Sequence, residues 1–123
     1  MSVAESVKKL ISLVENGKFL DAIQQFYAEG ASMQENNAPL RVGLPALLEN
    51  ERKFLTTVKF SVSRAESFVV DGNRAAINWI FEFTDPKGQK RRLDEVAYQV
   101  WQDGKIIRER FYYDPAQSQA EAK

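Results

Sequence analysis

The first half of the chain spaces its hydrophobic residues with the period of an α-helix. After Ser2 they recur three or four positions apart, which makes one face of a helix apolar; they are Val3, Val7, Leu10, Ile11 and Val14. Ser2 and Glu5 fit a capping box at the start of this helix. Asn16-Gly17 ends it, because glycine tolerates the left-handed cap conformation.

Two further helices are expected, with an irregular segment between them. The second has an apolar stripe and closes at Gly30; the stripe is Phe19, Leu20, Ile23, Phe26 and Tyr27. Residues 31–42 show no regular period, and Asn36-Asn37-Ala38-Pro39 is typical of a turn. Pro45 suits the first turn of the third helix, one side of which carries Leu44, Leu47, Leu48, Glu51 and Leu55.

The second half of the chain changes to the period of a β-strand. Val58, Phe60 and Val62 alternate with polar residues, which is typical of a half-buried strand. Three turn sequences then delimit three more strands, expected at Arg74–Thr84, Gln89–Trp101 and Lys105–Tyr113. Helices followed by an antiparallel meander predict an α+β fold, with three helices packed on one face of a curved antiparallel sheet.

The length and charge of the chain indicate how many domains it has and which kinds of partner it binds. With 123 residues we expect a single domain over residues 1–115 and a frayed polar tail over residues 116–123. The 17 basic and 17 acidic residues balance, which argues against a nucleic-acid partner, since such binding shows as a basic surplus. No apolar run approaches the ~20 residues of a membrane span, and the first residues do not resemble a signal peptide. We therefore expect a cytoplasmic protein with no membrane partner.

Two missing residue types exclude much chemistry. Without cysteine there is no thiolate nucleophile, zinc–thiolate site or iron–sulfur cluster. Without histidine the usual general base near neutral pH and the commonest metal ligand are absent. No dense Asp/Asn/Gly loop of the calcium type is present. We expect no metal and no cofactor, and any acid–base chemistry falls to Asp, Glu, Tyr or Lys.

Three segments carry a family resemblance. They are Val14-Glu15-Asn16-Gly17-Lys18 with Phe26-Tyr27-Ala28; Ala31-Ser32-Met33-Gln34-Glu35-Asn36 running to Val42-Gly43; and Trp101-Gln102-Asp103-Gly104-Lys105-Ile106 running to Tyr112-Tyr113-Asp114-Pro115. In this order they resemble the SnoaL-like and nuclear transport factor 2-like superfamily, in its branch of polyketide cyclases and ketosteroid isomerases. The resemblance covers nearly the whole chain and implies a cystatin-like cone with an internal pocket. It is specific for the fold and weak for function, because this cone hosts isomerases, cyclases and non-catalytic binders.

The resemblance also implies site positions. The general base of ketosteroid isomerases matches Glu35, and their two oxyanion donors match Leu10 and Ala97, which cannot donate. Steroid enolisation requires donors where the enolate oxygen forms, so we expect no ketosteroid isomerase activity. Glu35 could act as a base in a mostly apolar cavity, or it could be a solvated turn residue.

Strand alternation predicts the two faces of the sheet. Around the Asp85-Pro86-Lys87-Gly88 turn, the expected register sets Asn78 opposite Glu95, with the further pairs Glu82–Arg91, Ile80–Leu93 and Ala76–Ala97. The other face is almost wholly apolar and aromatic. Periodicity alone places this aromatic face against the helices, whereas the resemblance implies that it lies outside and forms a homodimer; its residues include Trp79, Phe81, Phe83 and Tyr98. The mixed face, with Asn78, Glu95 and Gln99, would then line the pocket.

The last hairpin decides where Glu109 points. A three-residue loop at Gln102-Asp103-Gly104 sets Glu109 opposite Ala97 and toward the pocket, together with Ile107, Phe111 and Tyr113. A two-residue loop turns Arg108, Arg110 and Tyr112 there instead, since one residue of register exchanges the faces. The resemblance favours an inward Glu109, as the second carboxylate of an acid–base pair or as the partner of a basic residue. We expect the pocket wall and core to include Tyr27, Trp101, Phe111 and Tyr113.

These residues support two functions. The first is an isomerase, cyclase or lyase with Glu35 as the base, assisted by Glu109, and a mostly apolar substrate with one or two oxygens. The second is a non-catalytic module that binds a small molecule or a partner subunit. A pocket without a polar purpose would be filled by leucine and phenylalanine, which favours the first. A scaffold recruited only through its surface is a third class.

Overall fold

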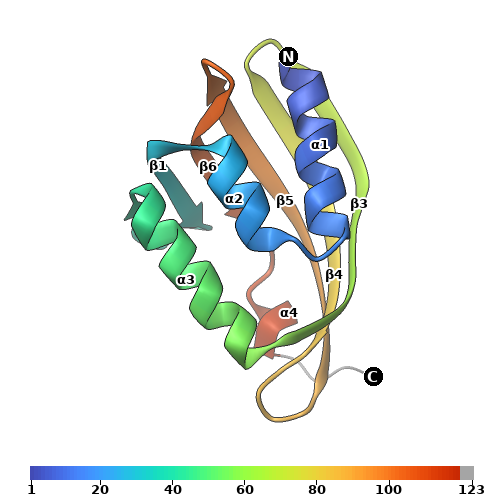
Figure 1. The fold of residues 1–123 in the computed structure, drawn as a ribbon. Helices are drawn as coiled ribbons and strands as arrows, with labels where there is room; N and C mark the ends of the chain where they lie inside the picture. The colour runs from blue at the N-terminus through green and yellow to red at the C-terminus, as the bar shows by residue number, and fades with distance from the viewer. Residues whose placement is uncertain (120–123) are drawn as a thin grey trace.

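The computed structural model describes residues 1–119 as three helices packed against one face of a six-stranded sheet (Figure 1). The helices are α1 (Val3–Glu15), α2 (Phe19–Phe26) and α3 (Leu44–Thr57), with a short α4 (Ala116–Gln119) at the end. The strands are β1 (Tyr27–Glu35), β2 (Arg41–Val42), β3 (Lys59–Asp71), β4 (Arg74–Thr84), β5 (Lys90–Gln102) and β6 (Lys105–Tyr112). The predicted α+β class is confirmed, although β1 and β2 come before α3 in the chain.

The first helix begins and ends where the sequence predicts. The Ser2 hydroxyl accepts a hydrogen bond from the Glu5 main-chain N–H, and the Glu5 carboxylate accepts one from the Ser2 N–H, which completes the capping box. Gly17 adopts the left-handed conformation that ends it (φ +77°). The next helix, in contrast, ends at Phe26 rather than at Gly30, because the chain from Tyr27 onward joins the sheet.

The sheet has the strand order β2-β1-β6-β5-β4-β3, and β1 runs parallel to β6. The prediction of a wholly antiparallel sheet is therefore wrong at this pair. Residues 31–35 were predicted to be irregular, but they belong to β1. Two consecutive residues, Ala31 and Ser32, are both buried there, and the pairing shifts between Tyr27 and Ser32. This irregularity hides the period of two that would reveal a strand.

The register between β4 and β5 differs by one residue from the prediction. Trp79 lies opposite Glu95, and Asn78 lies opposite Val96. The connecting turn spans five residues, because the Asp85 carboxylate accepts the main-chain N–H groups of Lys87 and Gln89. A shift of one residue exchanges the faces of one strand relative to the other.

The aromatic face therefore packs toward the helices, as periodicity alone predicts. The placement of Trp79, Phe81 and Phe83 on the outer surface is wrong, since all three line the interior. Tyr98 does lie on the outer face, where it accepts a hydrogen bond of 2.7 Å from the Arg74 guanidinium.

A bulge corrects the register of the last hairpin. Asp103 and Gly104 form a two-residue turn with positive φ angles of 53° and 80°, so the predicted three-residue loop is wrong. The pairing then shifts at Ile107, which has no partner on β5 and is partly exposed. The extra residue restores the inward orientation of Glu109, as predicted, but opposite Gln99 rather than Ala97. Ile107 itself does not face the pocket.

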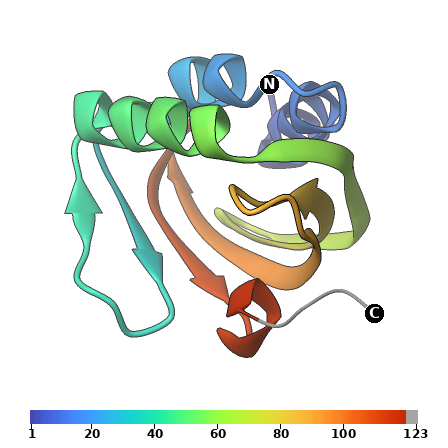
Figure 2. The same ribbon diagram turned by 90° about the horizontal axis from the view of Figure 1, so that it is seen from below.

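The helices form one layer across the concave side of the curved sheet (Figure 2). The core between them contains Val7, Leu10, Leu47, Ile77, Trp101 and Ile106. On the convex side α4 packs against β5, and the Gln117 amide exchanges two hydrogen bonds with the main chain of Asp94. Residues 120–123 of the predicted tail lie outside the described residues. Within residues 1–119, no helix is long and apolar enough to cross a membrane.

Candidate functional site

A cavity of about 810 Å³ lies between the helices and the concave face of the sheet. One wall is aromatic and comes from α2, α3, β3 and β4; its residues are Phe19, Phe54, Phe60, Trp79, Phe81 and Phe83. The rings contact one another: Trp79 stacks on Phe81 with centroids 5.5 Å apart, and Phe60 lies 4.8 Å from Phe19. This wall is apolar and tightly packed.

Four carboxylates form the opposite wall. Glu35, Glu109 and Glu95 come from β1, β6 and β5, which are neighbouring strands, and Glu51 comes from α3. Because β4 and β3 follow β5 in the sheet, the cavity changes from acidic to aromatic across the strand order. Among the described residues, no ion pair includes any of these four glutamates.

Glu109 is held by a chain of hydrogen bonds. The Tyr27 hydroxyl donates to one carboxyl oxygen of Glu109, and the Gln99 amide donates to the other at 2.7 Å. The Trp101 indole N–H donates to the Gln99 oxygen at 3.0 Å, which fixes the orientation of that amide. Glu109 is only 2% exposed. Its side chain therefore has one defined position at the cavity wall.

The pKa of the Glu109 carboxyl is raised from 4.5 to about 7. Burial is the main cause, because a charged carboxylate loses its hydration there. The hydrogen bonds from Tyr27 and Gln99 lower the pKa and partly offset burial, whereas the charges of Glu51 and Glu35 raise it. Burial and the neighbouring Glu109 raise the pKa of the Tyr27 phenol well above its usual value.

Glu35 lies at the end of β1 and pairs with Tyr113. The Tyr113 hydroxyl donates to the Glu35 carboxylate at 2.5 Å. Burial, and then this hydrogen bond and charge, raise the pKa of the Tyr113 phenol. Glu35 is more exposed than Glu109 and lines the cavity, so it is neither purely solvated nor deeply buried.

Glu95 and Glu51 face the cavity without a hydrogen bond to either carboxyl group among the described residues. Glu95 is 8% exposed, and burial followed by repulsion from Glu35 raises its pKa to about 8. The same two causes raise the pKa of Glu51 to about 7. Glu51 was not among the predicted site residues. The sequence pattern that could have identified it is its place in the apolar stripe of the third helix, where a carboxyl group has no structural use.

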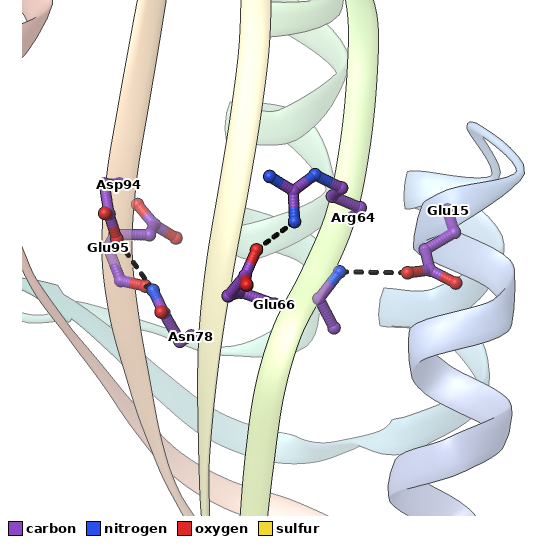
Figure 3. Close-up of polar contacts among 7 residues, drawn as sticks. Glu15, Arg64, Glu66, Asn78, Asp94 and Glu95 are labelled. Atoms are coloured by element: carbon purple, nitrogen blue, oxygen red, sulfur yellow. Dashed lines mark hydrogen bonds and ion pairs between the residues drawn. The ribbon is translucent and has the colours of Figure 1, made fainter.

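The other predicted site residues take different places. Phe111 lines the cavity, whereas Gln99 and Trp101 are fully buried behind its wall. Asn78 does not reach the pocket: it is on the outer face, and its amide donates to the Asp94 carboxylate at 2.7 Å and to the main-chain oxygen of Glu95 (Figure 3). The prediction of Asn78 as a pocket residue is wrong because the register of β4 and β5 is shifted by one.

Figure 3 also shows how the neighbouring edge strand is supported. The Glu15 carboxylate at the end of α1 accepts a hydrogen bond of 2.9 Å from the main-chain N–H of Ala65 on β3. Arg64 and Glu66 form an exposed ion pair on the same strand. An ion pair of this kind contributes little to stability. The Glu15 contact joins the helical layer to β3, which supplies part of the aromatic wall.

Cationic side chains also lie at or near the cavity. Arg91 forms a buried ion pair with Asp85 at 2.9 Å, and its Nη1 atom has no hydrogen-bond partner. Main-chain N–H groups, that of Gln89 above all, and Arg91 hold the pKa of Asp85 below its usual value. Arg41 and Lys53 also line the cavity. Within residues 1–119, no group of three or more acidic side chains is arranged to hold a metal ion.

The two positions that the resemblance assigns to oxyanion donors are apolar in the structure too. Leu10 lines the cavity, and Ala97 is fully buried at the sheet. Neither side chain can donate a hydrogen bond. Charge that develops on a ligand oxygen would have to be stabilised by other groups of the wall.

Comparison with known proteins supports the fold. The family model for the SnoaL-like domain matches residues 7–109. A candidate SnoaL-like polyketide cyclase from Mesorhizobium loti is 26% identical, with a TM-score of 0.84 over 92% of this chain and 100% of that one. A candidate polyketide cyclase from Pseudomonas putida is 19% identical, with a TM-score of 0.81 over 99% of both chains. A candidate isomerase from Bacillus subtilis is 17% identical, with a TM-score of 0.76 over 92% of this chain and 86% of that one. No protein of curated function matches the chain.

Proposed function

Because this chain belongs to the SnoaL-like domain family, we propose that it is a cofactor-independent isomerase, cyclase or lyase for a small, mostly apolar molecule. The observation that carries the proposal is the state of Glu109. Its carboxyl group is buried at the cavity wall, has no cationic partner among the described residues, and is held at both oxygens by neutral donors. A carboxylate in this setting is suited to proton transfer.

Glu109 acts as the general base. Its pKa of about 7 lies close to neutral pH, where a base combines a useful fraction of the ionised form with enough proton affinity. Tyr27 and Gln99 fix the carboxylate without neutralising it, so it keeps lone pairs for a substrate C–H or O–H. Trp101 holds Gln99 in place from behind the wall and acts as a positioning residue.

Glu95 supplies the hydrogen-bond donor that Leu10 and Ala97 cannot. With a pKa of about 8 it is mostly protonated at neutral pH, so its carboxylic acid can donate to a substrate oxygen. A neutral carboxylic acid in an apolar site is an effective way to stabilise charge that develops on an enolate oxygen. The predicted base Glu35, paired with Tyr113, provides a second acid–base pair for returning a proton.

The relatives support this class of reaction. The Mesorhizobium loti protein, which matches over almost the whole chain, is a candidate polyketide cyclase, and the Bacillus subtilis protein is a candidate isomerase. Both names are of reaction classes that a general base can catalyse. A base and a neutral acid in one largely aromatic cavity fit that chemistry.

The test combines titration and exchange. The carboxyl carbon of Glu109, assigned with Glu109→Gln, should titrate near 7 by NMR. The protein should also speed the exchange of α-protons of β-tetralone, a small aromatic ketone, into deuterated water. Glu109→Gln should lower this rate by roughly 10²–10⁴-fold, the usual contribution of a general base, whereas exposed Glu29→Gln should not. Titration near 4.5, with no exchange, would contradict the proposal.

A second function, a non-catalytic binding module, is favoured by one observation. Leu10 and Ala97 leave the two family donor positions apolar. In that case the cavity would bind a small molecule and Glu109→Gln would change affinity alone. Measuring binding and exchange on the same variant separates the two functions.

A further inference from the structure

We propose that the substrate carries an ammonium group, bound between Glu51 and Glu35, and an apolar body that packs on the aromatic wall. This substrate class rests on the proposed function, which gives roles to Glu109, Glu95 and Glu35 and leaves Glu51 without one. The ammonium group and the apolar body occupy the parts of the cavity that the proton transfer does not use.

The first observation is the unpartnered carboxyl group of Glu51. This residue faces the cavity from α3, where the same side of the helix buries Leu47, and its carboxyl group has no hydrogen bond or ion pair among the described residues. Glu51 is partly buried, and a carboxyl group shielded from water without a donor lowers the stability of the fold. Its position therefore has no structural explanation, and a ligand group with N–H donors would supply the missing partners.

The second, independent observation is the buried carboxyl group of Glu95. This residue is 8% exposed, points into the same cavity from the sheet, and its carboxyl group is also unpartnered among the described residues. On the same acidic wall, Glu35 has a single donor among the described residues, the Tyr113 hydroxyl. The acidic wall thus offers more acceptor atoms than the described protein donors fill, which indicates that a ligand with donors completes it.

The other charged groups of the cavity do not serve this purpose. Arg41 and Lys53 line it from β2 and α3, but neither forms an ion pair with a cavity glutamate in the described part of the chain. Asp85 is already paired with Arg91. The charges that raise the pKa of Glu51 and Glu95 are those of other glutamates. Among the described residues, the glutamates of the acidic wall therefore have no cationic partner, and an organic cation would take that place.

The aromatic wall accounts for the rest of the ligand. Its six rings face the carboxylates from α2, α3, β3 and β4, and a cavity of about 810 Å³ holds a molecule far larger than a metal ion. Rings of this kind pack an apolar body and also attract a cation over their faces. Glu95 lies opposite Trp79, so the acidic and the aromatic walls adjoin and one small molecule can contact both.

Binding of such a ligand is coupled to proton release. Repulsion between the glutamates contributes, after burial, to pKa values of about 7 for Glu51 and about 8 for Glu95. A bound ammonium group between Glu51 and Glu35 offsets that repulsion and lowers the pKa of Glu51, while Glu95 keeps its proton as the donor to the substrate oxygen. Other ionisable side chains line the same cavity: Tyr27 and Glu35 from β1, Glu109 from β6, Tyr113 after it, Arg41 from β2, Lys53 from α3 and Asp85 from the turn after β4. Affinity for an amine should therefore rise as the pH increases from about 6 to about 8.

The experiment compares three probes of one shape by isothermal titration calorimetry: phenethylamine, phenethyl alcohol and phenylacetate. The amine should bind about tenfold or more tightly than the alcohol, the factor expected for one charged hydrogen bond. It should release protons, seen as a dependence of the heat on the ionisation enthalpy of the buffer. Glu51→Gln should weaken amine binding about tenfold and leave alcohol binding unchanged. Glu49→Gln, an exposed position on the same helix, should change neither.

Equal or tighter binding of the alcohol or of phenylacetate would overturn the proposal, and so would a failure of all three probes to bind at their solubility limits. An unchanged amine affinity in Glu51→Gln would do the same. These outcomes differ from a failure of the proposed function. If Glu109 titrates near 7 and β-tetralone exchanges its protons while the amine has no advantage, the reaction class stands and only the ammonium group is wrong.

Discussion

Glu95 on β5 lies directly opposite Trp79 on β4, and this pair marks the line where the acidic wall of the cavity meets the aromatic wall. Trp79 stacks on Phe81, so the side of Glu95 that faces β4 meets rings rather than donors. Burial of a carboxyl group beside such rings raises its pKa, to about 8 for Glu95. The strand register thus sets both the shape and the acidity of the cavity.

Replacing Tyr27 by phenylalanine should raise the pKa of Glu109 above its value of about 7. The Tyr27 hydroxyl donates to the Glu109 carboxylate and lowers that pKa, so its removal leaves burial less opposed. We also expect a loss of about 1–3 kcal/mol in the free energy of unfolding at pH 8, because a buried acceptor loses a donor. NMR titration of the Glu109 carboxyl carbon and urea unfolding measure the two effects.

The matched control for this change is Tyr112→Phe. Tyr112 is 45% exposed on the outer face, next to Arg110. It should leave the Glu109 titration unchanged. If both variants titrate like the wild-type protein, the Tyr27 hydroxyl does not act on Glu109 and the proposed base lacks its positioning.

Glu95→Gln should stabilise the protein at pH 8 and not at pH 4. The folded-state pKa of about 8 lies above the ordinary value of 4.5, so the neutral form is favoured in the folded state. As the pH rises from about 4.5 to about 8, the unfolded chain loses this proton first, and stability is lost. The variant should escape that loss, a gain of the order of a few kcal/mol at pH 8.

Urea unfolding at both pH values tests this difference. Glu29→Gln, at an exposed position, should show the pH dependence of the wild-type protein. A Glu95→Gln variant that tracks the wild type between pH 4 and pH 8 would mean that Glu95 is ionised in the folded state, and the proposed donor to the substrate oxygen would be lost.

Local patterns predicted the elements of this fold well. The capping residues of the first helix, Pro45 at the third and the Asp-Gly turns all act through neighbours in sequence, and the first and third helices and strands β4 to β6 form close to where expected. The early end of α2 at Phe26 follows from the start of β1. The exception is β1, whose parallel partner β6 is far away in the chain. Its Ala31 and Ser32 are both buried through an irregular pairing that no local pattern records.

The site was predictable only in part because it depends on register. Glu35, Glu95, Glu109, Tyr27, Phe111 and Tyr113 do face the cavity. Asn78 does not, since the Asp85 carboxylate closes a turn one residue longer than expected. Glu109 reaches its place through a turn and a bulge whose shifts cancel. The role of each residue in a reaction, and a cytoplasmic location, stay predictions.

The turn before β6 offers a test of the backbone. Gly104 has a φ of +80° with open space around it, so Gly104→Ala should lower stability by about 1–2 kcal/mol through backbone strain alone. Gly30→Ala is the control, since Gly30 also has open space but no positive φ. Thermal unfolding of both variants measures the effect. Equal melting temperatures would show that the hairpin relaxes into another turn.

Homodimer formation through the outer sheet face also stays a prediction, with different contact residues. Trp79, Phe81 and Phe83 line the cavity, so the apolar part of the outer face is instead Val96 opposite Tyr112, which are 39% and 45% exposed. We expect sedimentation equilibrium to give twice the chain mass of 14.0 kDa. Val96→Asp should shift the protein to the monomer, because a carboxylate cannot be buried there without a partner. Leu40→Asp, at an exposed position in the turn before β2, should leave the dimer intact. If the wild-type protein sediments as a monomer, the dimer prediction is wrong and this face packs only against α4 of its own chain.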